Sequence, residues 1–148
     1  MRTFGARLFN IAEDRWEKSD IHVHFPEGAV PKDGPSAGVA IALAIASVMS
    51  GIPVRPGVAM TGEVTLRGTV LRVGGLQAKL MAAKKGDIRT VYIPRDNLPE
   101  LAKIPDEIKS GMRIFPAEQA ETVIRECLAA AEERPVTPRF DDRTATPQ

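Results

Sequence analysis

The chain has 148 residues, 43% of them hydrophobic and 26% charged, a composition typical of one compact globular domain. Its 20 basic and 19 acidic residues leave a formal charge of +1, which argues against nucleic acid and anionic membranes as partners. The longest nearly apolar run, residues 37–49, is shorter than the roughly 20 residues that cross a bilayer, and the single Cys127 cannot form an internal disulfide, so we expect a soluble protein of the reducing cytoplasm.

Two elements are predicted before the first glycine-rich segment. Apolar residues recur every four positions between residues 4 and 16, which predicts an amphipathic helix within residues 1–20. The letters "IHVHF" at 21–25 alternate apolar residues with histidines, the pattern of a strand with one buried face. His22 and His24 have no third ligand or HExxH partner in the sequence, so we predict no metal site.

The next segment, "PKDGPSAG", contains a serine in the pattern G-x-S-x-G. Ser36 opens an alanine-rich run that ends before Gly51 and Pro53, and this run is too long for a strand. Because the run is apolar almost all round, it predicts a buried helix over residues 36–50. Two interpretations of Ser36 remain open from these residues, namely a nucleophile or the N-cap of this helix.

The remaining elements alternate between strands and helices. Residues 58–73 predict a hairpin with a tight turn near "RGT", and residues 134–148 predict a disordered tail. The elements between them are a helix in "GGLQAKLMAAKKG", a strand "TVYIP", a turn-rich helical stretch "NLPELAKIPDEIK", a strand "MRIFP" and a closing helix "AEQAETVIRECLAAAEE". The sequence therefore predicts an α/β (α+β) domain over residues 21–133, with a mixed sheet and a hairpin packed with helices.

A nucleophilic serine needs a base. The only histidines, His22 and His24, precede Ser36, which is the wrong chain order for an α/β-hydrolase triad. A lysine can replace histidine if it is partly neutral. A lysine with the reference pKa of about 10.4 must lose about 2.4 pKa units, or roughly 3.3 kcal/mol, to be half neutral at pH 8. Only burial among apolar groups supplies such a shift.

Several lysines fall in polar or turn segments. Among the remaining lysines, Lys79 has the most apolar surroundings. On a helical wheel it lies at the edge of the stripe formed by Leu76, Leu80 and Ala83, near the positive end of its helix. The alternative is that Lys79 extends its charged end to solvent, as lysines beside an apolar stripe commonly do. No G-x-x-x-x-G-K-[ST] motif is present, so we expect no nucleotide cofactor in this chain.

Two stretches together carry a family signature. They are "DIHVHFPEGAVPKDGPSAG" and "VAMTGEVTLRGTVLRVGGLQAKLMAAKKGDIRTVYIP", and they closely resemble the C-terminal proteolytic domain of bacterial Lon proteases. The resemblance runs from about residue 6 to residue 128. It implies that Ser36 is the nucleophile and Lys79 its base, forming a Ser-Lys dyad. It also implies that Thr61 orients the lysine and that Asp33 lies at the mouth of the site.

The resemblance further implies an ATP-dependent serine endopeptidase that degrades misfolded or regulatory proteins in quality control. Its substrates would be unfolded proteins or peptides, its assembly a hexameric ring, and its ATP and Mg would be bound by an AAA+-type ATPase domain or subunit that this chain lacks. Strands that usually start the family's domain are expected to be missing. The backbone N–H groups of Ser36 and Ala37 would donate to the oxyanion. The alternative is a truncated non-catalytic module kept for oligomerisation or for docking to an ATPase.

Overall fold

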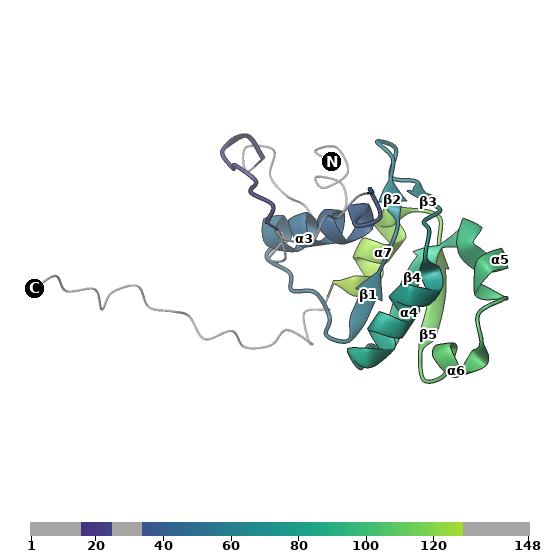
Figure 1. Ribbon diagram of the computed structural model, residues 1–148. Coiled ribbons are helices and arrows are strands. Elements are labelled where there is room, and N and C mark those ends of the chain that lie inside the picture. The colour runs from purple at the N-terminus through teal and green to yellow at the C-terminus, as the bar shows by residue number, and fades with distance from the viewer. Residues whose placement is uncertain (1–15, 25–33, 129–148) are drawn as a thin grey trace, which may run out of the picture.

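The computed structural model describes residues 16–24 and 34–128 (Figure 1). The predicted helix over residues 4–16 lies outside this part of the chain, except that Trp16 is helical together with Glu17. The predicted disordered tail, residues 134–148, lies outside it as well. The limits of the predicted domain, residues 21 and 133, therefore stay predictions.

The strands form a parallel sheet and a separate hairpin. The sheet has the order β1-β4-β5, with β1 at Val58–Met60, β4 at Thr90–Pro94 and β5 at Arg113–Ala117. Both pairings in this sheet are parallel. Strands β2 (Glu63–Val64) and β3 (Val70–Leu71) form the antiparallel hairpin expected around the "RGT" turn. The predicted α/β class is confirmed, with parallel and antiparallel pairing in one chain.

Helices cover both faces of the parallel sheet, as Figure 1 shows. They are α3 (Gly38–Ser50), α4 (Leu76–Lys85), α5 (Leu98–Leu101), α6 (Asp106–Lys109) and α7 (Ala120–Cys127), with a short 3-10 turn η1 at Arg95–Asn97. Side chains of a strand alternate between the two faces. In β4, Val91 and Ile93 pack with α4, α5 and α6, whereas Tyr92 packs with α3 and α7. The domain therefore has two cores, one on each side of this sheet.

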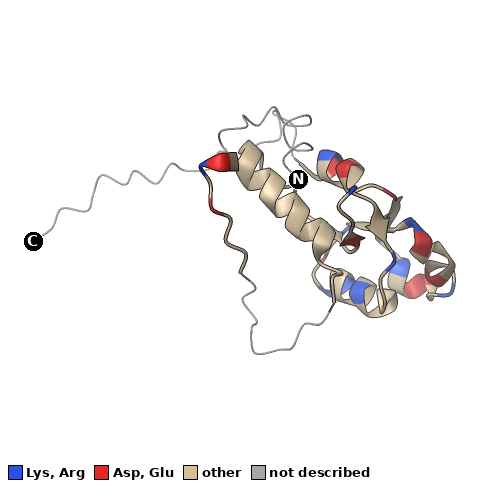
Figure 2. Cartoon of the chain, turned by 90° about the horizontal axis from the view of Figure 1, so that it is seen from above, with Lys and Arg blue, Asp and Glu red and all other residues tan. Residues whose placement is uncertain are grey.

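Helix α3 is less buried than the sequence predicts. Only one of its faces is buried, through residues such as Val39 and Leu43, while the side chain of Val48 on the opposite face is 73% exposed. Figure 2 shows that this helix carries no charged residue along its whole length. The predicted end at Gly51 is confirmed, because Gly51 takes a left-handed conformation with φ 71° and its N–H bonds to the carbonyl of Ser47.

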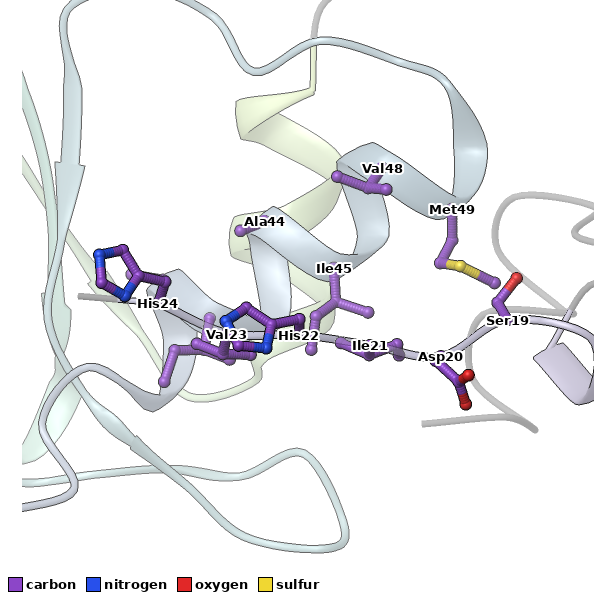
Figure 3. Close-up of a pocket in the computed structure, with 12 residues that line it drawn as sticks. Ser19, Asp20, Ile21, His22, Val23, His24, Ala44, Ile45, Val48 and Met49 are labelled. Atoms are coloured by element: carbon purple, nitrogen blue, oxygen red, sulfur yellow. The ribbon is translucent and has the colours of Figure 1, made fainter. Parts of the chain in front are cut away.

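The predicted strand at residues 21–25 is wrong for the part that the structure describes. Residues 21–24 have no strand pairing, and Ile21 and Val23 are about half exposed instead of buried. In the described chain, the parallel sheet is built only from strands after residue 57, so no neighbouring strand pairs with this segment. It lies instead along α3, and the two enclose a cavity of about 570 Å³ (Figure 3).

The last helix ends earlier than predicted. Helix α7 stops at Cys127, because Leu128 is extended and forms an antiparallel bridge with Val54. The N–H of Arg55 donates to the carbonyl of Cys127 at 2.8 Å, which fixes this turn of chain against the segment that follows α3. The side chain of Cys127 is fully buried and packs in the core between α3 and α7. Burial raises the pKa of its thiol to about 11.

Candidate active site

Ser36 lies in the turn that leads into α3. The N-cap position of this helix is Ala37, with φ −86° and ψ 0°, and no side chain bonds to the helix start. Of the two interpretations left open for Ser36, the structure does not support the N-cap. The turn closes through main-chain atoms instead, with the N–H of Gly38 donating to the carbonyl of Pro35 at 3.0 Å. The Ser36 hydroxyl is thus not used as a cap, and the side chain is partly exposed.

The main chain of Ser36 is anchored to the end of strand β1. Its carbonyl accepts the N–H of Gly62 at 2.9 Å and the hydroxyl of Thr61 at 3.3 Å. The carbonyl of Gly62 in turn accepts the N–H of Val39 in the first turn of α3, at 3.1 Å. This exchange of backbone hydrogen bonds ties the serine turn and the helix start to the carboxyl end of a sheet strand. That position in α/β folds is where ligand sites commonly form.

Two glycines make this close approach feasible. A Cβ on Gly62 would lie 2.6 Å from a methyl carbon of Val70 and 2.9 Å from one of Val39. A Cβ on Gly38 would lie 3.0 Å from the backbone nitrogen of Val64. The second glycine of G-x-S-x-G therefore has a packing role here, because it lets the helix start reach the backbone of the "MTGE" segment.

Lys79 lies in the first turns of α4, in the same pocket as Ser36. Its N–H donates to the carbonyl of Gly75 at 3.2 Å, and its side chain is partly buried. Lys79 and Ser36 line one pocket of about 240 Å³. The other lining residues are Ala37, Ala59, Met60, Thr61, Leu76, Leu80, Ala83 and Val91. The structure thus brings together the two residues that the sequence reasoning paired, although their roles stay predictions.

The pocket is an apolar setting for one amine. Among the described residues that line it, Lys79 alone has an ionisable side chain, and most of the others are aliphatic. The other lysines of α4 differ, since Lys84 and Lys85 are exposed in its last turn and the amine of Lys84 donates to the carbonyl of Glu107. Lys79 is therefore the one described residue of this pocket whose side chain could act as a general base.

The supporting residues of the prediction have different outcomes. Thr61 lies in the pocket and is buried, but the hydrogen bond that its hydroxyl donates goes to the Ser36 carbonyl rather than to the lysine. Thr61 therefore orients the serine turn in this structure. Asp33 lies outside the described residues. Ser36 and Ala37 line the pocket, and the assignment of their backbone N–H groups to the oxyanion stays a prediction.

Neither a metal site nor a membrane span occurs in the described part of the chain. Within residues 16–24 and 34–128, no three histidine, cysteine, aspartate or glutamate side chains come together as a group that could hold a metal ion. Across the same residues, none of the helices is both long and apolar enough to span a membrane.

One buried polar residue, near the chain that leads into α4, is not predicted from the sequence. Asn97 is completely buried and bonds to the backbone of Val73, just before the helix that carries Lys79. In the sequence it is one polar letter in "RDN", a turn-rich segment in which an asparagine is expected to be exposed. No local pattern could have identified its contact with Val73, because that backbone partner is 24 residues away.

Comparison with known proteins places the chain in a family. A family profile described as "Lon protease (S16) C-terminal proteolytic domain" matches residues 3–130. The chain is 54% identical over 124 residues to the Lon protease of Orientia tsutsugamushi (strain Ikeda), which covers 84% of this chain and 16% of that protein. It is 56% identical over 120 residues to Lon protease 1 of Hydrogenovibrio crunogenus, covering 81% of this chain and 15% of that protein.

A third relative extends the match along the chain. The Lon protease of Brucella suis biovar 1 is 50% identical over 139 residues, which is 94% of this chain and 17% of that protein. The chain thus spans about one sixth of the length of these curated relatives.

Proposed function

The chain belongs to the family of Lon protease (S16) C-terminal proteolytic domains, and we propose that it hydrolyses peptide bonds as a serine endopeptidase with a Ser36–Lys79 dyad. One observation carries the proposal. Ser36 in the turn before α3 and Lys79 on α4, far apart in sequence, line the same small apolar pocket at the carboxyl end of β1. Ser36 supplies the nucleophile and Lys79 the base, which is the Ser-Lys variant of the nucleophile-base pair.

In the proposed reaction the neutral Lys79 amine accepts the Ser36 hydroxyl proton while the serine oxygen attacks the peptide carbonyl. The oxyanion of the tetrahedral intermediate is stabilised by the backbone N–H groups of Ser36 and Ala37, at the positive end of α3. The Lys79 ammonium then returns the proton to the leaving amine, which gives an acyl-enzyme. Water, activated by the same amine, releases the acid and restores the serine.

Substrates, partners and location belong to the same proposal. We infer that unfolded proteins or peptides are the substrates, that copies of the chain assemble in a ring, and that an AAA+-type ATPase domain or subunit binds ATP and Mg²⁺ and delivers the substrate. The support is family membership, since the matched relatives are named Lon protease and are far longer than this chain. A free, buried cysteine favours the reducing cytoplasm as its compartment.

The proposal is tested with a fluorogenic peptide, an unfolded protein and a fluorophosphonate probe. Ser36→Ala removes the nucleophile and Lys79→Arg installs a cation that does not deprotonate, so each should lower kcat by on the order of 10³-fold or more and abolish labelling. Ser110→Ala and Lys85→Arg change an exposed serine and an exposed lysine and should leave both readouts unchanged. Full labelling of the Ser36→Ala variant would contradict the dyad.

The same assay separates the alternative of a non-catalytic module. A folded wild-type sample in which the probe leaves Ser36 unmodified, with and without an added ATPase subunit, would favour that alternative. Labelling of Ser36 in the wild-type chain favours the enzyme.

A further inference from the structure

The start of α4 is poorly fixed by its own sequence. The helix begins after Gly74 and Gly75, and Gly75 is its N-cap in a left-handed conformation with φ 67°. No side chain from within this turn bonds to the helix start, and its first turn has no acidic residue. A Cβ placed on either glycine would meet nothing within 4 Å, so packing does not restrain this turn either. Two successive glycines leave the backbone more freedom than any other pair.

Asn97 supplies part of the missing restraint from the 3-10 turn after β4. Its side-chain oxygen accepts the N–H of Val73 at 3.1 Å, and its side-chain nitrogen donates to the carbonyl of Val73 at 2.9 Å. The second proton of that nitrogen goes to Oε2 of Glu100, also at 2.9 Å. Asn97 is completely buried, and every one of these bonds uses a group that would be costly to leave unpaired.

Glu100 supplies the remaining restraint on the start of α4. Its Oε1 accepts the N–H of Leu76, the first residue of α4, at 3.1 Å. Its Oε2 also lies 3.6 Å from Nη2 of Arg72. A carboxylate at this position caps an unpaired N–H and complements the positive end of the helix dipole. Glu100 therefore caps the first N–H of the helix from a position 24 residues further along the chain.

The position of Lys79 follows from this turn. The N–H of Lys79 bonds to the carbonyl of Gly75, so Lys79 belongs to the first hydrogen-bonded turn of the helix. Leu76, whose N–H is held by Glu100, lines the same pocket as Lys79 and Ser36. Any shift of the glycine turn therefore moves the amine relative to Ser36 in the turn before α3. A displacement of about 1 Å can lower a reaction rate by on the order of 100-fold.

We propose that Asn97 and Glu100 are positioning residues that hold the start of α4, and thereby the amine of Lys79, at the distance from Ser36 that proton transfer requires. This inference rests on the proposed dyad. Neither residue lines the pocket, and both act through the backbone of Val73 and Leu76. Substrate binding should consequently depend on them much less than the chemical step does.

The central test is Glu100→Gln, which keeps the shape of the side chain. The carboxylate accepts protons from both Leu76 and Asn97, whereas an amide has one oxygen and presents a donor to the other partner, so one bond is lost. We expect kcat with a fluorogenic peptide to fall about 10-fold and KM to stay within about twofold. Glu100→Asp, which keeps both oxygens and the charge, should recover most of the loss.

Glu121→Gln is the matched control. This carboxylate lies on α7, across the sheet from α4, and accepts a hydrogen bond from Nη2 of Arg125 at 2.7 Å. Its replacement should leave kcat and KM unchanged. An unchanged kcat in a folded Glu100→Gln variant, or a loss that appears only in KM, would overturn the inference.

A second readout does not depend on catalysis. Hydrogen exchange of the Lys79 amide should be about 10-fold or more faster in Glu100→Gln than in the wild type, while the amides of β4 exchange at the wild-type rate. Equal exchange at Lys79 in both proteins would overturn the positioning role even if activity changes. A wild-type chain that neither cleaves peptide nor reacts with fluorophosphonate would contradict the proposed function, and the exchange measurement would still decide the role of Asn97 and Glu100.

Discussion

The two segments that carry the proposed dyad, the turn before α3 and helix α4, are anchored by different chemistry. The turn of Ser36 and the start of α3 are held by main-chain hydrogen bonds to Gly62, in a contact so close that only glycines fit. The start of α4, the helix of Lys79, is held by the side chains of Asn97 and Glu100. They bind the backbone on either side of a pair of glycines that packing does not restrain. The nucleophile is thus placed by backbone, and the base by side chains.

This difference predicts different responses to substitution. On the serine side, most side-chain changes leave the anchoring bonds intact, because those bonds belong to the main chain. Damage there requires a new Cβ where no space exists. On the lysine side, single side-chain changes should loosen the helix or its first turn. The following substitutions test this contrast.

The largest effect is expected on the lysine side, from Leu80→Ala. Leu80 is fully buried beside Leu76 and fixes α4 to the sheet. Truncation leaves a cavity and should lower the free energy of unfolding by about 2 to 5 kcal/mol, as measured by urea denaturation. Met81→Ala, at the neighbouring half-exposed position, is the control and should change it by less than about 1 kcal/mol. Similar losses for both variants would show that α4 is not held by its buried face.

On the serine side, Gly62→Ala should give the next largest effect. The added methyl would meet Val70 and Val39 at 2.6 Å and 2.9 Å, so the strand end and α3 must move apart. We expect a loss of about 1 to 3 kcal/mol in the free energy of unfolding and slower fluorophosphonate labelling of Ser36. Gly74→Ala introduces a methyl that meets nothing within 4 Å and should be milder. Equal stability of Gly62→Ala and the wild type would break the proposed contrast.

A smaller effect is expected from Thr61→Val, which removes the hydroxyl that donates to the Ser36 carbonyl. That carbonyl keeps the N–H of Gly62, so we expect a loss of only about 1 kcal/mol in unfolding free energy and less than a threefold change in labelling rate. Thr61→Ser should restore both values. Loss of labelling as complete as in Lys79→Arg would instead indicate that Thr61 acts on the lysine, as the family resemblance implies.

The smallest effect concerns alkaline pH and the side of the sheet that carries α3 and α7. Burial raises the pKa of the Cys127 thiol from 9.0 to about 11, so the folded chain holds this proton more tightly than the unfolded chain. The resulting stabilisation is complete below pH 9 and is lost as pH rises through 11. At pH 9 only a small part of this stabilisation, less than about 1 kcal/mol, is lost. The free energy of unfolding, measured by urea denaturation, should decline less between pH 7 and pH 9 in Cys127→Ala than in the wild type. An identical decline in the two proteins would refute this assignment.

Much of the fold on the lysine side could be predicted from sequence. The glycines that bound α4, the β-branched residues of β4 and Pro105 in the helical stretch are local signals, and each marks an element that the structure contains. The signal that points to Lys79 is also local, because its apolar neighbours follow from helical spacing. The structure places Lys79 in one pocket with Ser36.

The rest depends on contacts between distant residues. The alternation in "IHVHF" predicts a strand, but a strand exists only where another lies beside it, and residues 21–24 have none in the described structure. Ser36 looks like a cap in sequence, yet the backbone of Gly62 takes the space and the bonds at that turn. The pairing of Asn97 with Val73 likewise follows from the crossover between strands and has no periodic signature.

The parallel pairing of β1 with β4 has a consequence for the time course of folding. The two strands are joined through the β2–β3 hairpin and α4, so they can meet only after that intervening chain has collapsed. Ser36 is anchored to the end of β1, and its assembly should therefore be among the last events as the polypeptide matures. In a partly folded chain the Ser36 hydroxyl would be unreactive. Stopped-flow refolding should therefore show that reactivity toward fluorophosphonate rises only after the far-ultraviolet helical signal is complete.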